Sequence, residues 1–174
     1  MPLYIKALEY QSLPMNTSES DISFFRQAIR LALDAEKEGN LPIGAVISLD
    51  GEIIAEGKNA IWFPQFNPNR HAEIEALRNV PEGLWKSSRK MTLYTTLEPC
   101  LMCVGAILLH HIGRVMYGSA DDFGGAGLVF GHTPPYFEEE ASRTEWIGPA
   151  YAEECDKLFV RVMKMVEENR SRES

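Results

Sequence analysis

The sequence predicts a single α/β domain. The chain has 174 residues, and one domain usually contains about 100–200 residues. Hydrophobic residues make up 45% and charged residues 24% of the chain, which is ordinary globular usage and excludes a fully disordered or collagen-like protein. In the middle of the chain a strand-like run, a helical run and a second strand-like run follow one another, an order that implies a parallel crossover.

The folded part is predicted to begin near residue 21. Residues 1–20 show no periodicity and contain two prolines and a Ser/Asn/Thr cluster, so they are interpreted as an N-terminal arm, with the domain over residues 21–174. Apolar residues then recur at helical spacing up to Gly39, and Ser20 or Asp21 is the expected N-cap. The apolar stripe of this helix consists of Ile22, Phe25, Ile29, Ala32 and Leu33.

Two strand-like runs follow, Ile43–Leu49 and Glu52–Asn59, and Asp50-Gly51 lies between them. This residue pair favours a type I′ turn because both of its residues tolerate positive φ, so an antiparallel hairpin is expected. After a loop over residues 60–70, the pattern predicts helix His71–Arg78, strand Met91–Thr96, helix Cys100–His111, strand Arg114–Tyr117, a glycine-rich segment over 118–135 that is a connector or a lid, strand Arg143–Ile147 and a final helix over 150–168.

Charge and cysteine content limit the function classes. Lys and Arg number 17 and Asp and Glu number 25, giving a net charge of −8, so any nucleic-acid contact has to be local. No apolar run approaches the roughly 20 residues of a membrane-spanning helix, and the first residues do not form a signal peptide. Three cysteines are an odd number and a poor disulfide framework, which favours a reducing, cytoplasmic location.

Two short motifs carry the chemistry: His71-Ala72-Glu73 and Pro99-Cys100-Leu101-Met102-Cys103. One imidazole and two thiols are good zinc ligands, and a catalytic zinc site has three protein ligands and one open position. Cys100 and Cys103 are three residues apart at the expected start of a helix, so both sulfur atoms share a face and the helix dipole favours their thiolate forms. Pro99 is expected in the first helical turn, where no N–H is needed.

Glu73 is expected beside the metal without binding it. Two thiolates and a neutral imidazole cancel the charge of Zn²⁺, so the ion is a mild Lewis acid and needs a nearby base. Glu73 is therefore the predicted catalytic residue: it takes a proton from water, passes it to a ring nitrogen of the substrate, and helps an exocyclic amine leave as ammonia.

The pattern H-x-E…P-C-x-x-C is the signature of zinc nucleobase deaminases. The sequence resembles the cytidine-deaminase superfamily, nearest to its branch of tRNA adenosine deaminases, guanine deaminases and fungal-type cytosine deaminases, over about residues 22–168. The resemblance rests on Pro42–Val46, Glu56–Asn59, His71–Glu73, Leu93–Ala106 and Ile112–Val115. It implies a three-layer α/β/α sandwich around a five-stranded mixed sheet, one zinc ion per chain, a homodimer, and substrate contacts from Asn59 and, near the mouth of the site, Asp121.

The substrate is harder to predict, because the loops depart from this branch. Asn67-Pro68-Asn69-Arg70 stands where relatives commonly have Asp-Pro-Thr-Ala, and the basic residues form only small groups: Lys86, Arg89 and Lys90, and Arg161, Lys164, Arg170 and Arg172. The first hypothesis is a free nucleobase or nucleoside of guanine, adenine or cytosine type. The alternative is wobble adenosine in tRNA, converted to inosine. A non-catalytic zinc-binding scaffold is the third hypothesis, which the presence of Glu73 disfavours.

Other residues have two interpretations each. Cys155 is a core residue or a fourth ligand, His132 is an exposed loop residue or a substrate contact, and Arg70 binds a phosphate or pairs with an acid. The aromatic residues Trp62, Phe63 and Phe66 stack on a base or pack on the protein. His110-His111 are expected to end a helix at the surface, and Glu138–Glu140 to form a solvated face.

Overall fold

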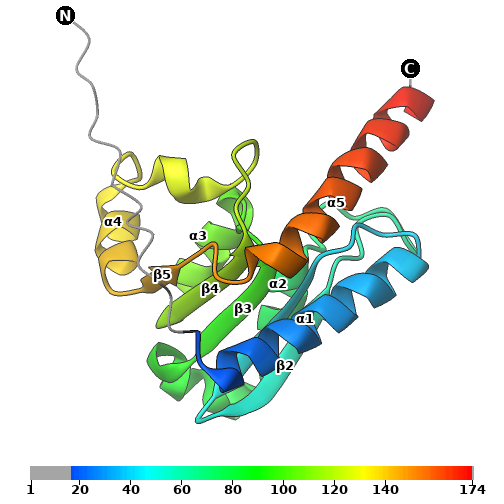
Figure 1. The fold of residues 1–174 in the computed structure, drawn as a ribbon. Helices are drawn as coiled ribbons and strands as arrows, with labels where there is room; N and C mark the ends of the chain where they lie inside the picture. The colour runs from blue at the N-terminus through cyan, green and yellow to red at the C-terminus, as the bar shows by residue number, and fades with distance from the viewer. Residues whose placement is uncertain (1–16, 174) are drawn as a thin grey trace, which may run out of the picture.

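The computed structural model describes residues 17–173. In this part of the chain a five-stranded mixed sheet lies between two layers of helices (Figure 1), which confirms the predicted three-layer α/β/α sandwich. The strand order is β2-β1-β3-β4-β5; β1 pairs antiparallel with β2 and β3, and β3, β4 and β5 run parallel. The strands are β1 (Gly44–Leu49), β2 (Glu52–Lys58), β3 (Thr92–Leu97), β4 (Arg114–Ser119) and β5 (Glu145–Ile147).

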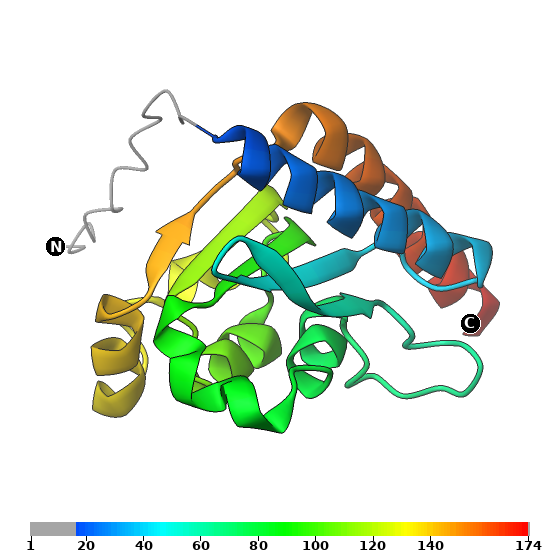
Figure 2. The same ribbon diagram turned by 90° about the horizontal axis from the view of Figure 1, so that it is seen from below.

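Helices cover both faces of the sheet. The long helices α1 and α5 lie on one face and α2 and α3 on the other, with α4 next to α3 beyond the β5 edge (Figure 2). The bounds are α1 (Glu19–Lys37), α2 (Ala72–Arg78), α3 (Leu101–Leu109), α4 (Pro135–Ser142) and α5 (Ala152–Glu173), with 3₁₀ helices at Glu82–Lys90 and Ala126–Val129. No helix in the described part of the chain is long and apolar enough to cross a membrane.

Alternation along β1 explains why this strand is apolar on both faces. Ala45 and Ile47 belong to the core on the α2 and α3 side, whereas Val46 packs with Phe25 and Tyr94 under α1. Neighbouring side chains on a strand point to opposite faces, so a central strand covered on both sides has to be apolar throughout. The predicted hairpin is confirmed: Asp50 and Gly51 have φ values of 52° and 85°.

Helix α1 begins earlier than predicted. Ser18 is the N-cap: its hydroxyl accepts from the Asp21 N–H, and the Asp21 carboxylate accepts from the Ser18 N–H. This reciprocal capping box satisfies two N–H groups that the first turn leaves free, so the expected N-cap at Ser20 or Asp21 was wrong. The other end agrees with the prediction, since Gly39 has a φ of 86° just beyond the helix. Of the arm predicted over residues 1–20, residues 1–16 lie outside the described residues. The prediction is wrong for residues 18–20, which form the N-cap and the start of α1.

The chain between β4 and β5 is more ordered than its glycine content indicated. It includes a 3₁₀ turn and α4, and the predicted solvated face at Glu138–Glu140 is wrong for Glu140. Glu140 is buried and accepts from Arg89 and His111, while Glu138 accepts from the backbone N–H groups of residues 131 and 133. Glu140 thus connects α4 to the 3₁₀ helix Glu82–Lys90 and to the residue pair after α3, while Glu138 connects α4 to the loop that precedes it. The local sequence pattern does not reveal this arrangement.

Candidate metal centre and active site

The three predicted metal ligands meet where two helices begin. His71 is the N-cap of α2 and Cys100 the N-cap of α3, and neither side chain caps its own helix, so both are free to bind another group. Cys103 lies in the first turn of α3, and Pro99 precedes the N-cap instead of entering that turn. Gly57 in β2 lets α2 approach the sheet, because a Cβ atom there would lie 2.1 Å from the Ala72 carbonyl oxygen.

The spacing of the ligand atoms fits one zinc ion. The Cys100 Sγ, Cys103 Sγ and His71 Nδ1 atoms are 3.6 Å apart in each of their three pairs. A tetrahedral zinc ion with ordinary bond lengths of about 2.3 Å to sulfur and about 2.0 Å to nitrogen places its ligand atoms about 3.5–3.8 Å apart. Within the described residues this is the only such group of three, and no fourth protein ligand joins it.

The ligands influence each other's protonation. The hydrogen bonds with Cys103 and with His71 lower the pKa of Cys100 to about 4. The hydrogen bond to Cys100 also raises the pKa of His71. The pKa of Cys103 moves upward, because of its hydrogen bond with Cys100 and because the thiol is buried. A metal ion therefore displaces protons when it binds here, since it needs both thiolates and a neutral imidazole.

Glu73 lies in the first turn of α2, beside the ligands. Its Oε2 atom is 3.5 Å from Cys103 Sγ, and its Oε1 atom accepts a hydrogen bond of 3.0 Å from the Thr95 hydroxyl in β3. Only 3% of Glu73 is exposed, and burial raises the pKa of its carboxyl group. A carboxylate with few partners next to an open metal position is suited to exchanging protons.

Asn59 and Asp121 lie next to the two ligand-bearing segments. The Ala60 N–H donates to the Arg70 carbonyl, so Asn59 and His71 flank a bonded pair of residues. Asn59 is fully buried, and its Nδ2 atom has no hydrogen-bond partner among the described residues. Asp121 lies in the loop after β4, where its Oδ1 atom accepts from the N–H groups of Phe123 and Gly124.

Two residues of this region were not singled out from the sequence. Thr95 holds Glu73, and Glu98 accepts from the N–H groups of Asp121 and Gly127. Both belong to the stretch that carries the family resemblance, so their position was visible, but their partners lie far away in the sequence. Neither role follows from local spacing.

For most residues that had two interpretations, the structure supports the structural one. Cys155 is a buried core residue under Gly118, Arg70 pairs with Glu75, and His132 is exposed. His110 bonds the Ala106 carbonyl at the end of α3. Trp62 packs on the core, whereas Phe63 and Phe66 are exposed.

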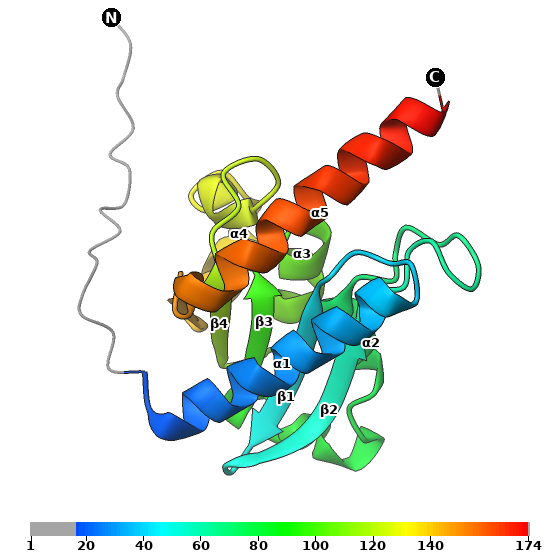
Figure 3. The ribbon, with the colours of Figure 1, turned by 45° about the vertical axis from the view of Figure 1, so that its right-hand side comes forward.

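The basic residues are separated by the fold. Lys86, Arg89 and Lys90 precede β3, at the opposite end of the strands from Cys100. Arg161 of α5 pairs with Glu36, and Lys58 with Glu38. The last turns of α5 and the loop over residues 60–70 project from the body (Figure 3).

The fold and the site together define a zinc-binding deaminase. Residues 18–119 match the family described as the cytidine and deoxycytidylate deaminase zinc-binding region, and the chain belongs to this family.

Two of the relatives that this chain is similar to are named as tRNA-specific adenosine deaminases. The chain is 40% identical over 159 residues to a tRNA-specific adenosine deaminase of Haemophilus influenzae, covering 88% of this chain and 89% of the relative. It is 30% identical to tRNA-specific adenosine deaminase 2 of Xenopus tropicalis, covering 86% and 92%.

Two solved structures of deaminases are also similar to this chain. One, from a study of A-to-I editing by tRNA:A34 deaminases, is 36% identical with a TM-score of 0.58 and covers 66% of this chain and 90% of its own. The guanine deaminase of Bacillus subtilis is 33% identical with a TM-score of 0.54, covering 65% and 77%.

Proposed function

We propose that this protein deaminates adenosine in tRNA, producing inosine. The observation that carries the proposal is the 40% identity to a tRNA-specific adenosine deaminase over 88% of the chain, together with the His71, Cys100, Cys103 and Glu73 group at a common site. Sequence reasoning puts a free base or nucleoside first because the loops differ and the chain is acidic. The similarity to relatives favours the tRNA alternative instead.

In the proposed reaction Glu73 moves the protons. When bound by His71, Cys100 and Cys103, zinc supplies the Lewis acidity that makes water a nucleophile near neutral pH. Glu73 takes a proton from that water as its oxygen bonds to the amine-bearing carbon, and gives the proton to the adjacent ring nitrogen. It then transfers the second water proton to the amine, the carbon–nitrogen bond breaks, and ammonia leaves as a carbonyl forms.

Asn59 is proposed as a substrate contact. A buried amide N–H without a partner costs about 1–3 kcal/mol, and a substrate acceptor would remove that cost. Asp121 is proposed at the mouth of the site, although its Oδ1 atom is already used by its own turn.

A free purine base is the second candidate. It is favoured by the pairing of cations with acids, Arg70 with Glu75, Lys58 with Glu38 and Arg161 with Glu36, because paired cations attract phosphate groups less strongly. The 33% identity to a guanine deaminase points the same way.

We also propose a homodimer through α3. Leu101 and Leu109 are 61% and 56% exposed, and Gly105 between them has open space where a side chain would be. An apolar stripe with a small residue at its centre suits close packing against the same helix of a second copy, as two-fold symmetric dimers require. Leu109→Glu should produce monomers in analytical ultracentrifugation, and an unchanged mass would contradict this interface.

The substrate can be determined with the zinc-loaded protein. We would measure inosine in full-length tRNA and in anticodon stem-loops, and ammonia release from adenosine, adenine, guanine and cytosine. Glu73→Gln is the inactive variant, and Glu52→Gln is the matched control because Glu52 is an exposed carboxylate at the hairpin end of β2.

Turnover of tRNA substrates alone would support the proposal. Turnover of a free base without inosine formation would overturn it in favour of the second candidate. No turnover of any substrate by protein that holds one zinc ion per chain would contradict both.

A further inference from the structure

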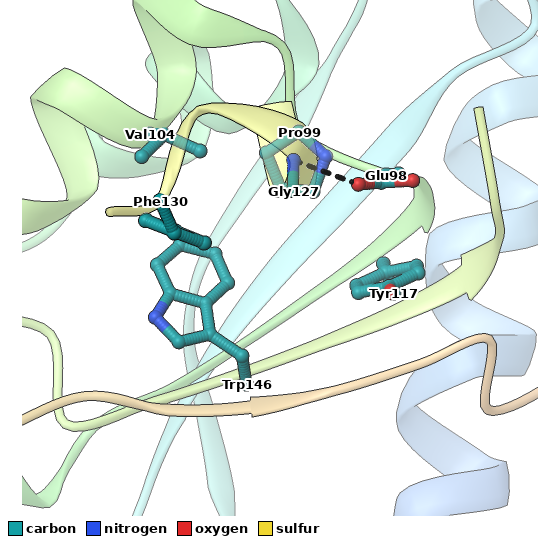
Figure 4. Close-up of a pocket in the computed structure, with 7 residues that line it drawn as sticks. All are labelled: Glu98, Pro99, Val104, Tyr117, Gly127, Phe130 and Trp146. Carbon is teal, nitrogen blue, oxygen red and sulfur yellow. Dashed lines mark hydrogen bonds between the residues drawn. The ribbon is translucent and has the colours of Figure 1, made fainter. Parts of the chain in front are cut away.

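The loop after β4 is fastened to the segment that carries a metal ligand. Glu98 lies between β3 and Cys100, and its two carboxylate oxygens accept from two backbone groups of the loop: Oε2 from the Asp121 N–H and Oε1 from the Gly127 N–H, each at 3.0 Å. Figure 4 shows the second of these bonds. One side chain therefore holds both ends of the loop over residues 121–127.

Backbone contacts reinforce this attachment. The Ala126 N–H donates to the Pro99 carbonyl at 3.0 Å, and Gly125 forms an isolated antiparallel bridge with Cys100. A Cβ atom on Gly125 would lie 2.5 Å from Glu98 Cδ, so the carboxylate occupies the space that a side chain of this residue would need. The loop thus closes around Glu98.

The fastened loop presents an exposed aromatic ring. Phe123 is 78% exposed, more than any other large hydrophobic residue in the described chain. Its N–H and that of Gly124 donate to Asp121 Oδ1 at 3.0 and 2.8 Å, so the turn that carries the ring is fixed. Phe123 is two residues from Gly125, the residue that bridges to Cys100. At about 3.5 Å per residue, at most about 7 Å of chain separates the two residues.

We propose that Glu98 is a positioning residue: it ties the 121–127 loop to the metal-ligand segment, so that Phe123 stacks on a base of the substrate. This inference rests on the proposed function for its substrate. Base stacking on aromatic rings tolerates any sequence and is a common source of affinity for single-stranded nucleic acids. The N–H groups of residues 121 and 127 are two separate donors, and a carboxylate offers one acceptor oxygen to each of them.

Glu98→Gln tests the anchor. Glutamine keeps one acceptor and turns the other into a donor, so one loop N–H loses its partner. We expect amide hydrogen exchange in the 121–127 segment of the zinc-loaded protein to become about tenfold faster, the size expected when one hydrogen bond to a charged acceptor is lost. Exchange in β1 and the zinc content should stay the same. Glu52→Gln is the matched control and should change neither.

Kinetics test the role of the ring. Phe123→Ala should raise KM for the anticodon stem-loop about fivefold or more, the size expected for the loss of one stacking contact, with kcat nearly unchanged and Phe123→Tyr restoring the wild-type KM. Glu98→Gln should raise KM in the same way. Because both residues act through one contact, the double variant should be no worse than the worse single variant, and additive effects would overturn the proposal.

The remaining outcomes are also decisive. Unchanged exchange in Glu98→Gln, or loss of zinc with a fall in kcat, would show that Glu98 does not act through the loop. Should Glu98→Gln fail to fold, Phe123→Ala and Phe123→Tyr still decide whether the ring contacts substrate. A wild-type protein without tRNA turnover would refute the proposed function and the stacking contact, whereas the exchange measurement would still decide whether Glu98 anchors the loop.

Discussion

Two buried carboxylates, Glu73 and Asp21, are held in opposite ways. They are 3% and 5% exposed, yet burial raises the pKa of Glu73 whereas the pKa of Asp21 is lowered. Burial also opposes the charge of Asp21, but hydrogen bonds from Ser18 and Tyr94 and the charge of Arg114 outweigh it. Partners, and not depth alone, therefore decide which charge a buried acid keeps.

This difference in pKa matches a difference in role: Glu73 is the proposed catalytic carboxylate and Asp21 a structural one. Asp21 closes the capping box of α1 and accepts from the Tyr94 hydroxyl at 2.6 Å, so it joins α1 to β3. These hydrogen bonds favour the charged carboxylate. Glu73 accepts from the Thr95 hydroxyl, from its own backbone N–H and, at 3.5 Å, from the Cys103 thiol, and these bonds do not outweigh its burial. A carboxyl group whose partners do not outweigh its burial can accept and return a proton at low cost.

The largest expected effect is on catalysis at Glu73. Glu73→Gln keeps the size and the buried position but removes the proton acceptor, and we expect turnover to fall by about 1,000-fold or more, within the range of general acid–base catalysis. Zinc per chain, measured by atomic emission, should stay at the wild-type value because Glu73 is not a ligand. Retained turnover would contradict the role of Glu73 as proton carrier.

At Asp21 the expected effect is on stability instead. Asp21→Asn removes one of the acceptor oxygens shared by Ser18, Tyr94 and Arg114, and should lower the free energy of unfolding by about 1–3 kcal/mol. Urea denaturation of the zinc-loaded protein measures this. Turnover at a temperature where both proteins are folded should not change, and a loss of activity without a loss of stability would show that the two carboxylates are coupled.

The pH dependence of the free energy of unfolding should also differ between the wild type and Asp21→Asn. Folding lowers the pKa of Asp21 below its ordinary value of 3.8, so the native state favours the charged form. This contribution is fully present above about pH 3.8 and is lost as the pH falls through the lower native pKa. The stability difference between wild type and Asp21→Asn should therefore shrink toward low pH. A difference that grows on acidification would show that the partners stabilise the protonated acid.

The sequence predicted those features that depend on local spacing. His71 and Glu73, and Cys100 and Cys103, each lie within one turn of chain, so residue type and helix position are enough to suggest a metal centre with an adjacent acid. The turn at Asp50-Gly51 is equally local. Each of these elements can be derived from a few neighbouring residues, because the geometry of one turn hardly depends on the rest of the fold.

Features that join distant segments could not be predicted. Tyr94 reaches Asp21 across 73 residues, and Arg89 reaches Glu140 across 51, so a sequence window shows only charged or polar side chains with no partner in view. The buried Nδ2 atom of Asn59, which has no hydrogen-bond partner among the residues that the structure describes, is of the same kind, because the lack of a partner becomes visible only after the chain has folded around it.

The smallest expected effect comes from Thr95, the hydrogen-bond donor to Glu73. Thr95→Val keeps the shape of a fully buried side chain and removes the hydroxyl that favours the charged form of Glu73. Losing this bond should cost about 0.5–1.5 kcal/mol, and turnover should fall by only about two- to tenfold because the carboxyl group itself remains. If the fall matched that of Glu73→Gln, orientation by Thr95 would be as necessary as the carboxyl group, and burial that outweighs the partners of Glu73 would no longer explain why it can exchange protons.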